Sequence, residues 1–357
     1  MSCEAQSLHS CPQIATAQKS LLLSLVSAPF VTQAVQMKYT PEEVVTAATA
    51  AAARIGEIIE RTALDHSPEF SAASGADVYL KRENQQLTGS FKIRGASNRL
   101  TTLTDEQRAR GCVAASSGNH GAAVACAMQR LATDGVIFVP EQTSKAKVDA
   151  IRSYGGNVQF FGTDGLDTEQ HAREYSEQHD MYYLSPYNDR EVIAGQGTCG
   201  VEILEQLPDV DAVFIAVGGG GLVSGVASVL KAHNPDILVY GCQPEASAVM
   251  AKSVEAGEIL DLPSDATLSD GTAGGIEAEA ITFELCSALI DEFVLVSEAE
   301  IAAAMRSYIA AENEPLEGAA GVAIAALLKR RDTVAGRKVA VIICGGNVSQ
   351  QVLDGIQ

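Results

Sequence analysis

The feature of this chain that most restricts its fold is an alternation of short apolar runs with longer helical runs. Eight runs have the length and the content of β-branched and aromatic residues that are typical of strands. Because they are apolar throughout, these strands are expected to be buried on both faces of a parallel sheet. The eight runs are Asp77–Glu83, Cys112–Ser116, Gly135–Pro140, Asn157–Gly162, Ala212–Gly218, Ile237–Gln243, Phe293–Ser297 and Lys338–Cys344.

Helical segments lie between these runs, for example at residues 121–130 and 222–233. The first helix is expected to begin at Pro41, where Thr40 can cap the helix and Glu43 completes a capping box. Strands that alternate with helices predict an α/β protein in which helices cover a parallel sheet. With 357 residues, the chain can form two domains or one large one.

Charge and cysteine content exclude several classes of function. The net charge of −20 argues against a nucleic-acid partner, because such a surface needs clustered lysine and arginine. No CxxC pair and no histidine cluster completes a zinc site. Several cysteines lie inside apolar runs, so we expect reduced thiols and a cytoplasmic compartment. The cysteines are Cys3, Cys11, Cys112, Cys126, Cys199, Cys242, Cys286 and Cys344.

The first 39 residues differ from the rest and are expected to form an N-terminal extension (1–39). Their apolar stretch, residues 21–31, is far shorter than the roughly 20 residues that a membrane helix needs, so no membrane partner is expected. Lys19 and Lys38 are the only basic residues before Arg54, although the segment is rich in serine and poor in acids. An organellar transit peptide and a plain extension are therefore both open.

Three of the expected strands run into unusual loops. The run at 112–116 leads into SGNHG at 117–121, and the run at 212–218 leads into GGGGLVSG. The last run leads into CGGNVS at 344–349. In open α/β sheets, ligands bind beyond the carboxyl ends of the strands, so these loops are candidates for a binding site.

Four consecutive glycines, Gly218–Gly221, leave backbone N–H groups uncovered next to a helix N-terminus, which favours a phosphate. Val223 and Ser224 break the GxGxxG spacing and no P-loop motif occurs, so a nucleotide-binding oxidoreductase is not supported. A tight turn without a ligand is the alternative. The SSGNHG loop can bind a carboxylate, or merely cap a helix beside a surface histidine, and His120 alone is expected to be structural.

Lys92 lies in LTGSFKIRGASN, between a glycine-serine turn and a helical run. A single lysine is usually a solvated surface residue. Beside a phosphate site and a carboxylate site, however, a partly desolvated amine can form a Schiff base with an aldehyde. Pyridoxal phosphate carries one aldehyde and one phosphate, and its substrates carry the carboxylate of an amino acid. The loops together therefore favour a pyridoxal-phosphate site around Lys92.

The motifs GSFKIRGA, SSGNHG, GGGGLVSG and CGGNVS, in this order and spacing, resemble those of the serine/threonine dehydratase and serine racemase family. The resemblance runs from about Tyr39 to the C-terminus. It implies the tryptophan-synthase-β type (fold type II) of pyridoxal-phosphate-dependent enzyme, an α/β fold with two open, twisted, mainly parallel sheets flanked by helices. It further implies a large cofactor-binding domain at 40–109 and 188–357, a small domain at 110–187, and a homodimer.

The resemblance also implies roles for individual residues. Lys92 is expected to form the Schiff base with pyridoxal phosphate and to take the α-proton, and Ser117 is expected to be the acid or base on the opposite face. The residues expected to contact the cofactor are Phe91 and Gly271 on the two ring faces, Asn119 near the ring hydroxyl, Glu317 near the ring, Cys344 at the pyridine nitrogen, and Gly218, Gly219, Gly220, Gly221 and Leu222 at the phosphate. The expected substrate loop consists of Ser116, Ser117, Gly118, Asn119 and His120.

Cys344 bears on the type of reaction. A thiol with a reference pKa of about 8.5 is a poor counterion for a protonated pyridine, so the ring withdraws electrons less strongly than it would beside an aspartate. This favours loss of a β-leaving group over transamination. We therefore expect dehydration and deamination of L-threonine or L-serine to a 2-oxo acid and ammonia. Three alternatives are open: a serine racemase with side dehydratase activity, a 3-hydroxyaspartate dehydratase, and a catalytically silent amino-acid-binding relative.

One departure from the family concerns metal binding. Many relatives carry an acidic metal ligand before the proline of a motif after the glycine-rich helix, where this chain has Gln243. Val249 stands where a second acid would be. A divalent cation there is not expected, and the identity of any metal is open. The chain ends at Gln357, so a regulatory domain after Cys344, as in the biosynthetic threonine enzymes, is not expected either.

Overall fold

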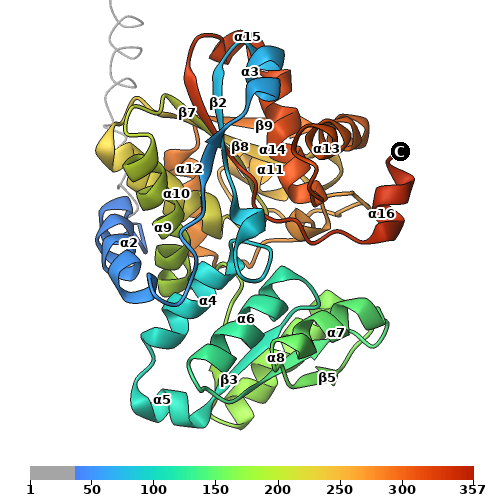
Figure 1. Cartoon of the computed structure of the whole chain (residues 1–357). Coiled ribbons are helices and arrows are strands. Elements are labelled where there is room, and N and C mark those ends of the chain that lie inside the picture. Colours follow the sequence, from blue (N-terminus) through green and yellow to red (C-terminus); the bar gives the residue numbers. More distant parts are fainter. Residues whose placement is uncertain (1–36) are drawn as a thin grey trace, which may run out of the picture. The chain divides into compact units, whose positions relative to one another are not determined.

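The structure is a computed structural model that describes residues 37–357, of which Lys38–Gln357 form one compact unit (Figure 1). Most of the expected N-terminal extension, residues 1–36, lies outside the described residues. Tyr39 is buried, and the guanidinium of Arg190 lies over its ring. Within the described residues no helix combines the length and the apolar character needed to cross a membrane.

The first described helix, α2 (Pro41–Ile55), begins where the sequence predicts. The Thr40 hydroxyl accepts a hydrogen bond from the Glu43 backbone N–H at 3.3 Å, and the Glu43 carboxylate accepts one from the Thr40 N–H at 2.8 Å. This capping box satisfies backbone donors that the first turn leaves free. The buried face of α2 packs against α9 (Arg190–Gln206) and α10 (Gly221–His233).

The larger sheet has six strands in the order β1-β2-β10-β7-β8-β9. Every neighbouring pair is parallel except β1 and β2, which are antiparallel. Figure 1 shows α13 and α14 on one side of this sheet and α2, α9 and α10 on the other. The strands are β1 (Leu64–His66), β2 (Asp77–Lys81), β7 (Ala212–Ala216), β8 (Leu238–Pro244), β9 (Glu292–Val296) and β10 (Lys338–Ile342).

The second sheet has four parallel strands in the order β5-β4-β3-β6. Alternate residues of its strands enter two apolar clusters, one shared with α6 and α7 and the other with α8. Two mainly parallel sheets flanked by helices confirm the predicted fold class. The domain division at residues 110 and 187 stays a prediction. The elements are β3 (Cys112–Ala115), β4 (Gly135–Val139), β5 (Val158–Phe160), β6 (Tyr182–Tyr183), α6 (Asn119–Arg130), α7 (Lys145–Ser153) and α8 (Gly165–Gln178).

All eight strands expected from the sequence are present, with ends that differ by at most two residues. The sequence pattern missed β1 and β6, which have three and two residues and are too short to show a period. The remaining helices are α3 (Pro68–Ser74), α4 (Lys92–Thr101), α5 (Asp105–Arg110), α11 (Val249–Ala256), α12 (Ile281–Leu289), α13 (Glu298–Glu312), α14 (Gly318–Lys329), α15 (Arg331–Val334) and α16 (Gln350–Gly355).

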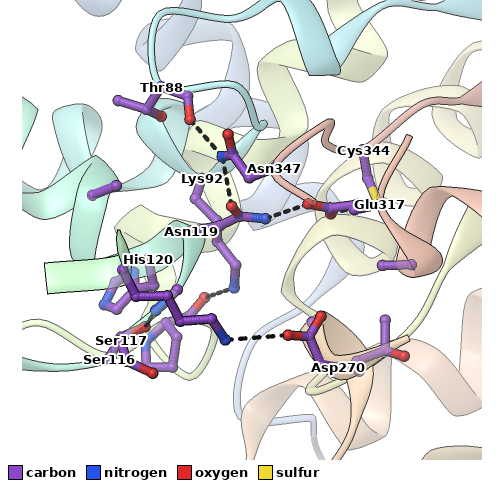
Figure 2. Close-up of a pocket in the computed structure, with 18 of the residues that line it drawn as sticks. Thr88, Lys92, Ser116, Ser117, Asn119, His120, Asp270, Glu317, Cys344 and Asn347 are labelled. Atoms are coloured by element: carbon purple, nitrogen blue, oxygen red, sulfur yellow. Dashed lines mark hydrogen bonds and ion pairs between the residues drawn. The ribbon is translucent and has the colours of Figure 1, made fainter. Parts of the chain in front are cut away.

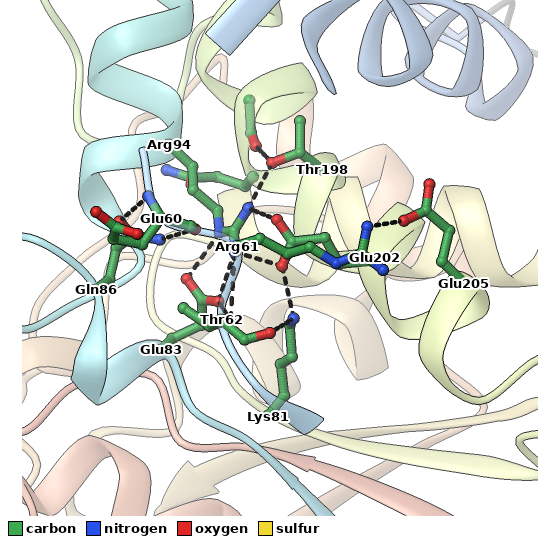
Figure 3. A network of polar contacts seen from close by, with 12 residues as sticks. Glu60, Arg61, Thr62, Lys81, Glu83, Gln86, Arg94, Thr198, Glu202 and Glu205 are labelled. Atoms are coloured by element: carbon green, nitrogen blue, oxygen red, sulfur yellow. Dashed lines mark hydrogen bonds and ion pairs between the residues drawn. The ribbon is translucent and has the colours of Figure 1, made fainter. Parts of the chain in front are cut away.

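A group of buried charged side chains ties α4 to β2 and α9 (Figure 3). The Arg94 guanidinium, fully buried, donates to both oxygens of Glu83 at 2.7 Å and to Glu202 at 2.7 Å. The Lys81 ammonium donates to Glu202 at 2.6 Å and to the Thr62 carbonyl at 2.8 Å. Because each buried charge has a partner of opposite sign, the group holds α4 in one position against its neighbours.

Candidate active site

A cavity of about 720 Å³ opens among the loops that follow β3, β7 and β10. Residues of both sheets and of the segments between them line it. Every residue that the resemblance assigned to the site lines this one cavity, although the residues come from positions more than 200 apart in the chain. They are Phe91, Lys92, Ser116, Ser117, Gly118, Asn119, His120, Gly218, Gly219, Gly220, Gly221, Leu222, Gly271, Glu317 and Cys344.

Lys92 is the first residue of α4, and its amine faces the cavity (Figure 2). Nζ donates a hydrogen bond to the Pro186 carbonyl at 2.9 Å and lies 5.2 Å from the centre of the Phe91 ring. The Phe91 N–H donates to the Cys344 carbonyl at 3.1 Å, which ties the start of α4 to the end of β10. Burial lowers the Lys92 pKa to about 8, although the acidic groups of Cys344 and Glu317 oppose the shift. Near neutral pH, a fraction of the Lys92 side chain is therefore unprotonated and can act as a nucleophile.

The four glycines after β7 form a concave strip of backbone at the start of α10. Gly220 has a left-handed backbone, with φ of 85°, which side chains rarely adopt. A Cβ on Gly219 would lie 2.4 Å from the ring of Tyr187, so the backbone and this ring are in direct contact. The free N–H groups and the dipole of the 13-residue helix α10 make this strip suitable for a single phosphate.

Residues Ser116–Asn119, the SSGN loop, join β3 to α6, and Asn119 is the first residue of that helix. The Gly118 N–H donates to the Ser116 hydroxyl at 3.2 Å. The Asn119 amide donates to Glu317 at 2.8 Å and accepts from the Asn347 amide at 2.8 Å (Figure 2). These contacts leave the Ser117 hydroxyl at the cavity wall next to a helix N-terminus, an arrangement that can bind a carboxylate.

Glu317 and Cys344 form a buried pair on the cavity wall. The Cys344 thiol donates a hydrogen bond to the Glu317 carboxylate at 3.6 Å, and Figure 2 shows both residues. Burial raises the pKa of Glu317 to about 7, although the hydrogen bond from Asn119 opposes this shift. Burial and the adjacent carboxylate also raise the pKa of Cys344 well above its usual value. The thiol is therefore neutral in the physiological range.

His120 is not on the surface, which excludes the reading of the loop as a cap beside a surface histidine. The side chain is 4 % exposed, and Nε2 donates to the Leu184 carbonyl at 2.9 Å. Burial, together with the charge of Lys92, lowers the His120 pKa to about 3. The imidazole is neutral and holds Leu184, as expected for a structural histidine, while one edge of it lines the cavity.

Three further residues take part in the site and were not assigned from the sequence. Pro186 accepts the hydrogen bond of Lys92 through its backbone carbonyl, and Tyr187 covers the glycine strip through its ring. Asn347 donates to both Asn119 and the Thr88 carbonyl at 2.8 Å. Asn347 lies inside CGGNVS and could have been found there. A backbone carbonyl and a ring brought in by tertiary packing leave no signal of their own in a sequence.

Gln243, at the position where many relatives have an acid, is buried and engaged at both ends of its amide. Its Nε2 donates to the Val217 carbonyl at 3.0 Å, and its Oε1 accepts from the Ala251 N–H at 2.8 Å. Residues 37–357 contain no group of three or more His, Cys, Asp or Glu placed to hold a metal ion. The expectation about a divalent cation stays a prediction.

The residues around the cavity fit pyridoxal phosphate. The glycine strip presents free N–H groups to a phosphate, and Lys92, whose pKa is lowered, supplies the amine for the aldehyde. A Cβ added at Gly271 would meet nothing closer than 3.6 Å, so this glycine leaves room for a flat ring. Phosphate site, amine and free space all belong to one cavity large enough for the cofactor and a small amino acid.

Comparison with known proteins also indicates a pyridoxal-phosphate-dependent enzyme. The chain is 41% identical to an L-threonine ammonia-lyase of Thermotoga maritima over 84% of this chain and 74% of that protein. It is 42% identical to a catabolic L-threonine dehydratase of Escherichia coli over 83% of this chain and 90% of that protein.

Solved structures agree with these sequence relatives. The processed form of threonine deaminase isoform 2 from Solanum lycopersicum superposes with a TM-score of 0.84 at 34% identity, covering 90% of this chain and 95% of that one. Maize serine racemase superposes with a TM-score of 0.83 at 32% identity, covering 87% of this chain and 95% of that one. A family model described as "Pyridoxal-phosphate dependent enzyme" matches residues 55–345. The chain therefore belongs to the family of pyridoxal-phosphate dependent enzymes.

Proposed function

We propose that this protein is an ammonia-lyase that converts L-threonine or L-serine to a 2-oxo acid and ammonia. The observation that carries the proposal is the Lys92 amine, with its lowered pKa, in one cavity with a glycine strip for a phosphate and a serine-asparagine loop for a carboxylate. The names of the relatives at about 40% identity support the choice of substrate.

When bound, pyridoxal phosphate supplies an aldehyde for the amino group of the substrate and a ring that draws negative charge away from Cα. We assign its phosphate to the glycine strip, where the helix dipole and the free N–H groups favour an anion. Phe91, Gly271 and Asn119 line the cavity; we assign Phe91 and Gly271 to the two faces of the ring and Asn119 to the ring hydroxyl. Glu317 and Cys344 would then lie beside the ring, with Cys344 assigned to its nitrogen.

Lys92 is assigned the proton transfer at Cα. An amine with a pKa of about 8 is a base that can both take and release a proton near neutral pH. The Pro186 carbonyl fixes the direction of Nζ through the hydrogen bond at 2.9 Å. In this assignment the SSGN loop binds the substrate carboxylate and so orients the Cα–H bond toward Nζ.

The neutral thiol of Cys344 supports elimination over other reactions of the same cofactor. A thiol whose pKa is raised cannot serve as the anionic partner of a protonated ring nitrogen. Beside this thiol, a bound ring would withdraw charge from Cα only weakly, which would favour rapid departure of a hydroxyl from Cβ. A β-hydroxy amino acid is the substrate class that carries this leaving group.

A serine racemase with side dehydratase activity is the second candidate. Ser117 lines the cavity, and its hydroxyl could deliver a proton to the face of Cα opposite Lys92. The similarity to maize serine racemase supports this candidate. It predicts D-serine as an additional product.

One experiment separates the candidates. Purified holoenzyme is incubated with L-threonine, L-serine and 3-hydroxyaspartate, and the 2-oxo acid and the enantiomers of each amino acid are measured. We expect a 2-oxo acid from L-threonine or L-serine. Formation of D-serine without any 2-oxo acid would refute the ammonia-lyase, and absence of any product would indicate a catalytically silent binding protein.

We further propose a homodimer in a reducing, cytoplasmic compartment. The six cysteines within the described residues are free and buried, which suits a reducing environment. Light scattering coupled to size-exclusion chromatography tests the dimer, and a mass of 37.3 kDa would contradict it. Fractionation of the source cells tests the compartment, and recovery of the protein with organelles would contradict a cytoplasmic location.

A further inference from the structure

The charged side chains that line the cavity determine which substrate side chains it can bind. Within the described residues the lining contains two lysines, Lys92 and Lys147, and two carboxyl groups, Asp270 and Glu317. Lys92 is assigned to the cofactor, and the imidazole of His120 is neutral. Lys147 is therefore the cation of the lining that could bind a negatively charged side chain of a substrate.

Lys147 is itself paired with a carboxylate. Its Nζ lies 3.4 Å from Oδ2 of Asp270. Lys147 belongs to the first turn of α7, whereas Asp270 lies in the short helical turn Asp270–Thr272 that Gly271 also belongs to. The two side chains are 49% and 72% exposed, so the pair is open to an incoming ligand and its partners can be separated at modest cost.

The same face of α7 also carries apolar residues. Lys147, Ala150, Ile151 and Tyr154 recur at the three- and four-residue spacing of one helix face, and all four line the cavity. Ile151 is buried, and the Tyr154 hydroxyl is occupied by a hydrogen bond to the Leu87 carbonyl at 3.2 Å. Ala150 and Ile151 offer contacts to a methyl group, and Lys147 is the charged residue that this part of the chain contributes to the lining.

We propose that Asp270 is a specificity-determining residue, which neutralises Lys147 and thereby reserves the cavity for β-hydroxy amino acids with neutral side chains. A substrate with a side-chain carboxylate, such as 3-hydroxyaspartate, would have to displace Asp270 from Lys147 and would meet the repulsion of Asp270 itself. L-threonine and L-serine meet neither cost. The inference rests on the proposed function, because it names the substrates that the same site accepts and rejects.

The test compares Asp270→Asn with the unchanged holoenzyme. For each, kcat/KM is measured with 3-hydroxyaspartate, through the oxaloacetate and ammonia formed, and with L-threonine, through 2-oxobutanoate and ammonia. We expect the ratio of the two kcat/KM values to shift toward 3-hydroxyaspartate by about fivefold, the size typical of partly exposed charge pairs. Binding of succinate relative to butyrate, measured by calorimetry, should shift in the same direction and gives a readout independent of turnover.

Two further variants show whether the shift depends on Lys147. In Asp270→Asn combined with Lys147→Met the gain should disappear, because the double variant has no lysine at position 147 to bind the substrate's side-chain carboxylate. Lys147→Met alone leaves Asp270 unpaired and should lower the ratio below that of the unchanged enzyme. Asp149→Asn is the matched control, since Asp149 pairs with the exposed Lys145 on the same helix and neither residue lines the cavity.

A ratio that does not change in Asp270→Asn, or a gain that persists without Lys147, would overturn the inference. A large loss of L-threonine binding in Lys147→Met would overturn it as well, because Lys147 would then bind the α-carboxylate. Failure of the proposed function looks different, since the unchanged holoenzyme would then release no 2-oxo acid from L-threonine or L-serine.

Discussion

Lys92, Glu317 and Cys344 show how burial sets protonation at the scale of single residues. Burial lowers the pKa of the amine to about 8, raises that of the carboxyl to about 7 and raises that of the thiol further. In each case the neutral form is favoured because the charged form loses its hydration. The site therefore holds an amine and an acid that both change charge close to physiological pH, and a thiol that stays neutral.

The Lys92 pKa predicts how the cofactor-free protein reacts with an amine-specific reagent. Only the unprotonated amine is nucleophilic, so the rate of modification at Lys92 should rise with pH through a midpoint near 8. The measurement is a pH series of short acylation reactions with quantitation of the Lys92 peptide by mass spectrometry. The rate of modification of the exposed Lys145 in the same samples is the control for the reactivity of the reagent. A Lys92 midpoint near the ordinary value of 10.5 would contradict the effect of burial.

At the scale of structural elements, the glycine strip depends on close contact with the segment before α9. The Tyr187 ring lies against Gly219, and the Cβ and backbone of Tyr187 lie against Gly221. The Thr282 hydroxyl donates to the Gly219 carbonyl at 2.7 Å. The adjacent Pro186 carbonyl holds Lys92. One short segment thus positions both the backbone assigned to the phosphate and the amine assigned to the aldehyde.

This contact predicts that Gly219→Ala weakens cofactor binding. The added methyl group would lie 2.4 Å from the Tyr187 ring, so the ring or the strip has to move. Strain of about 1–3 kcal/mol corresponds to an increase of about fivefold to 150-fold in the Kd for pyridoxal phosphate. Fluorescence titration of the cofactor-free protein measures it. Gly275→Ala, at a glycine with free space around it, is the control and should leave the Kd unchanged. Equal affinity in the two variants would contradict the account.

The buried charges around Arg94 give a second prediction at this scale. Arg94→Met leaves the carboxylates of Glu83 and Glu202 buried without their main partner, so the free energy of unfolding should fall by about 3–5 kcal/mol. Urea denaturation measures the change. Arg61→Met is the matched control, because Arg61 pairs with Glu205 at the exposed side of the same group (Figure 3) and its loss should cost no more than about 1 kcal/mol. Equal losses in both variants would refute the role of burial.

The strands and the loops that follow them could be predicted from the sequence for a physical reason. Strands buried on both faces are apolar throughout, and loops that bind anions need glycines that a sequence displays directly. Contacts that depend on tertiary packing could not be predicted. The burial of His120, the carbonyl of Pro186 and the ring of Tyr187 at the glycine strip all require knowledge of which segments meet.

At the scale of the whole molecule, the two sheets meet at a single cavity that neither could form alone. The SSGN loop follows a strand of the four-stranded sheet, whereas the glycine strip and Cys344 follow strands of the six-stranded sheet. The hydrogen bond from Asn119 to Glu317 joins the two sides at 2.8 Å. The chemistry proposed for the protein therefore depends on the packing of both sheets around one lysine.

Reduction of the holoenzyme with borohydride, followed by peptide mass spectrometry, tests this central claim most directly. The reagent converts a Schiff base into a stable secondary amine. We predict a reduced pyridoxal-phosphate adduct on Lys92 and its loss in Lys92→Ala. Absence of any adduct on Lys92, or an adduct confined to another lysine such as Lys147, would contradict it.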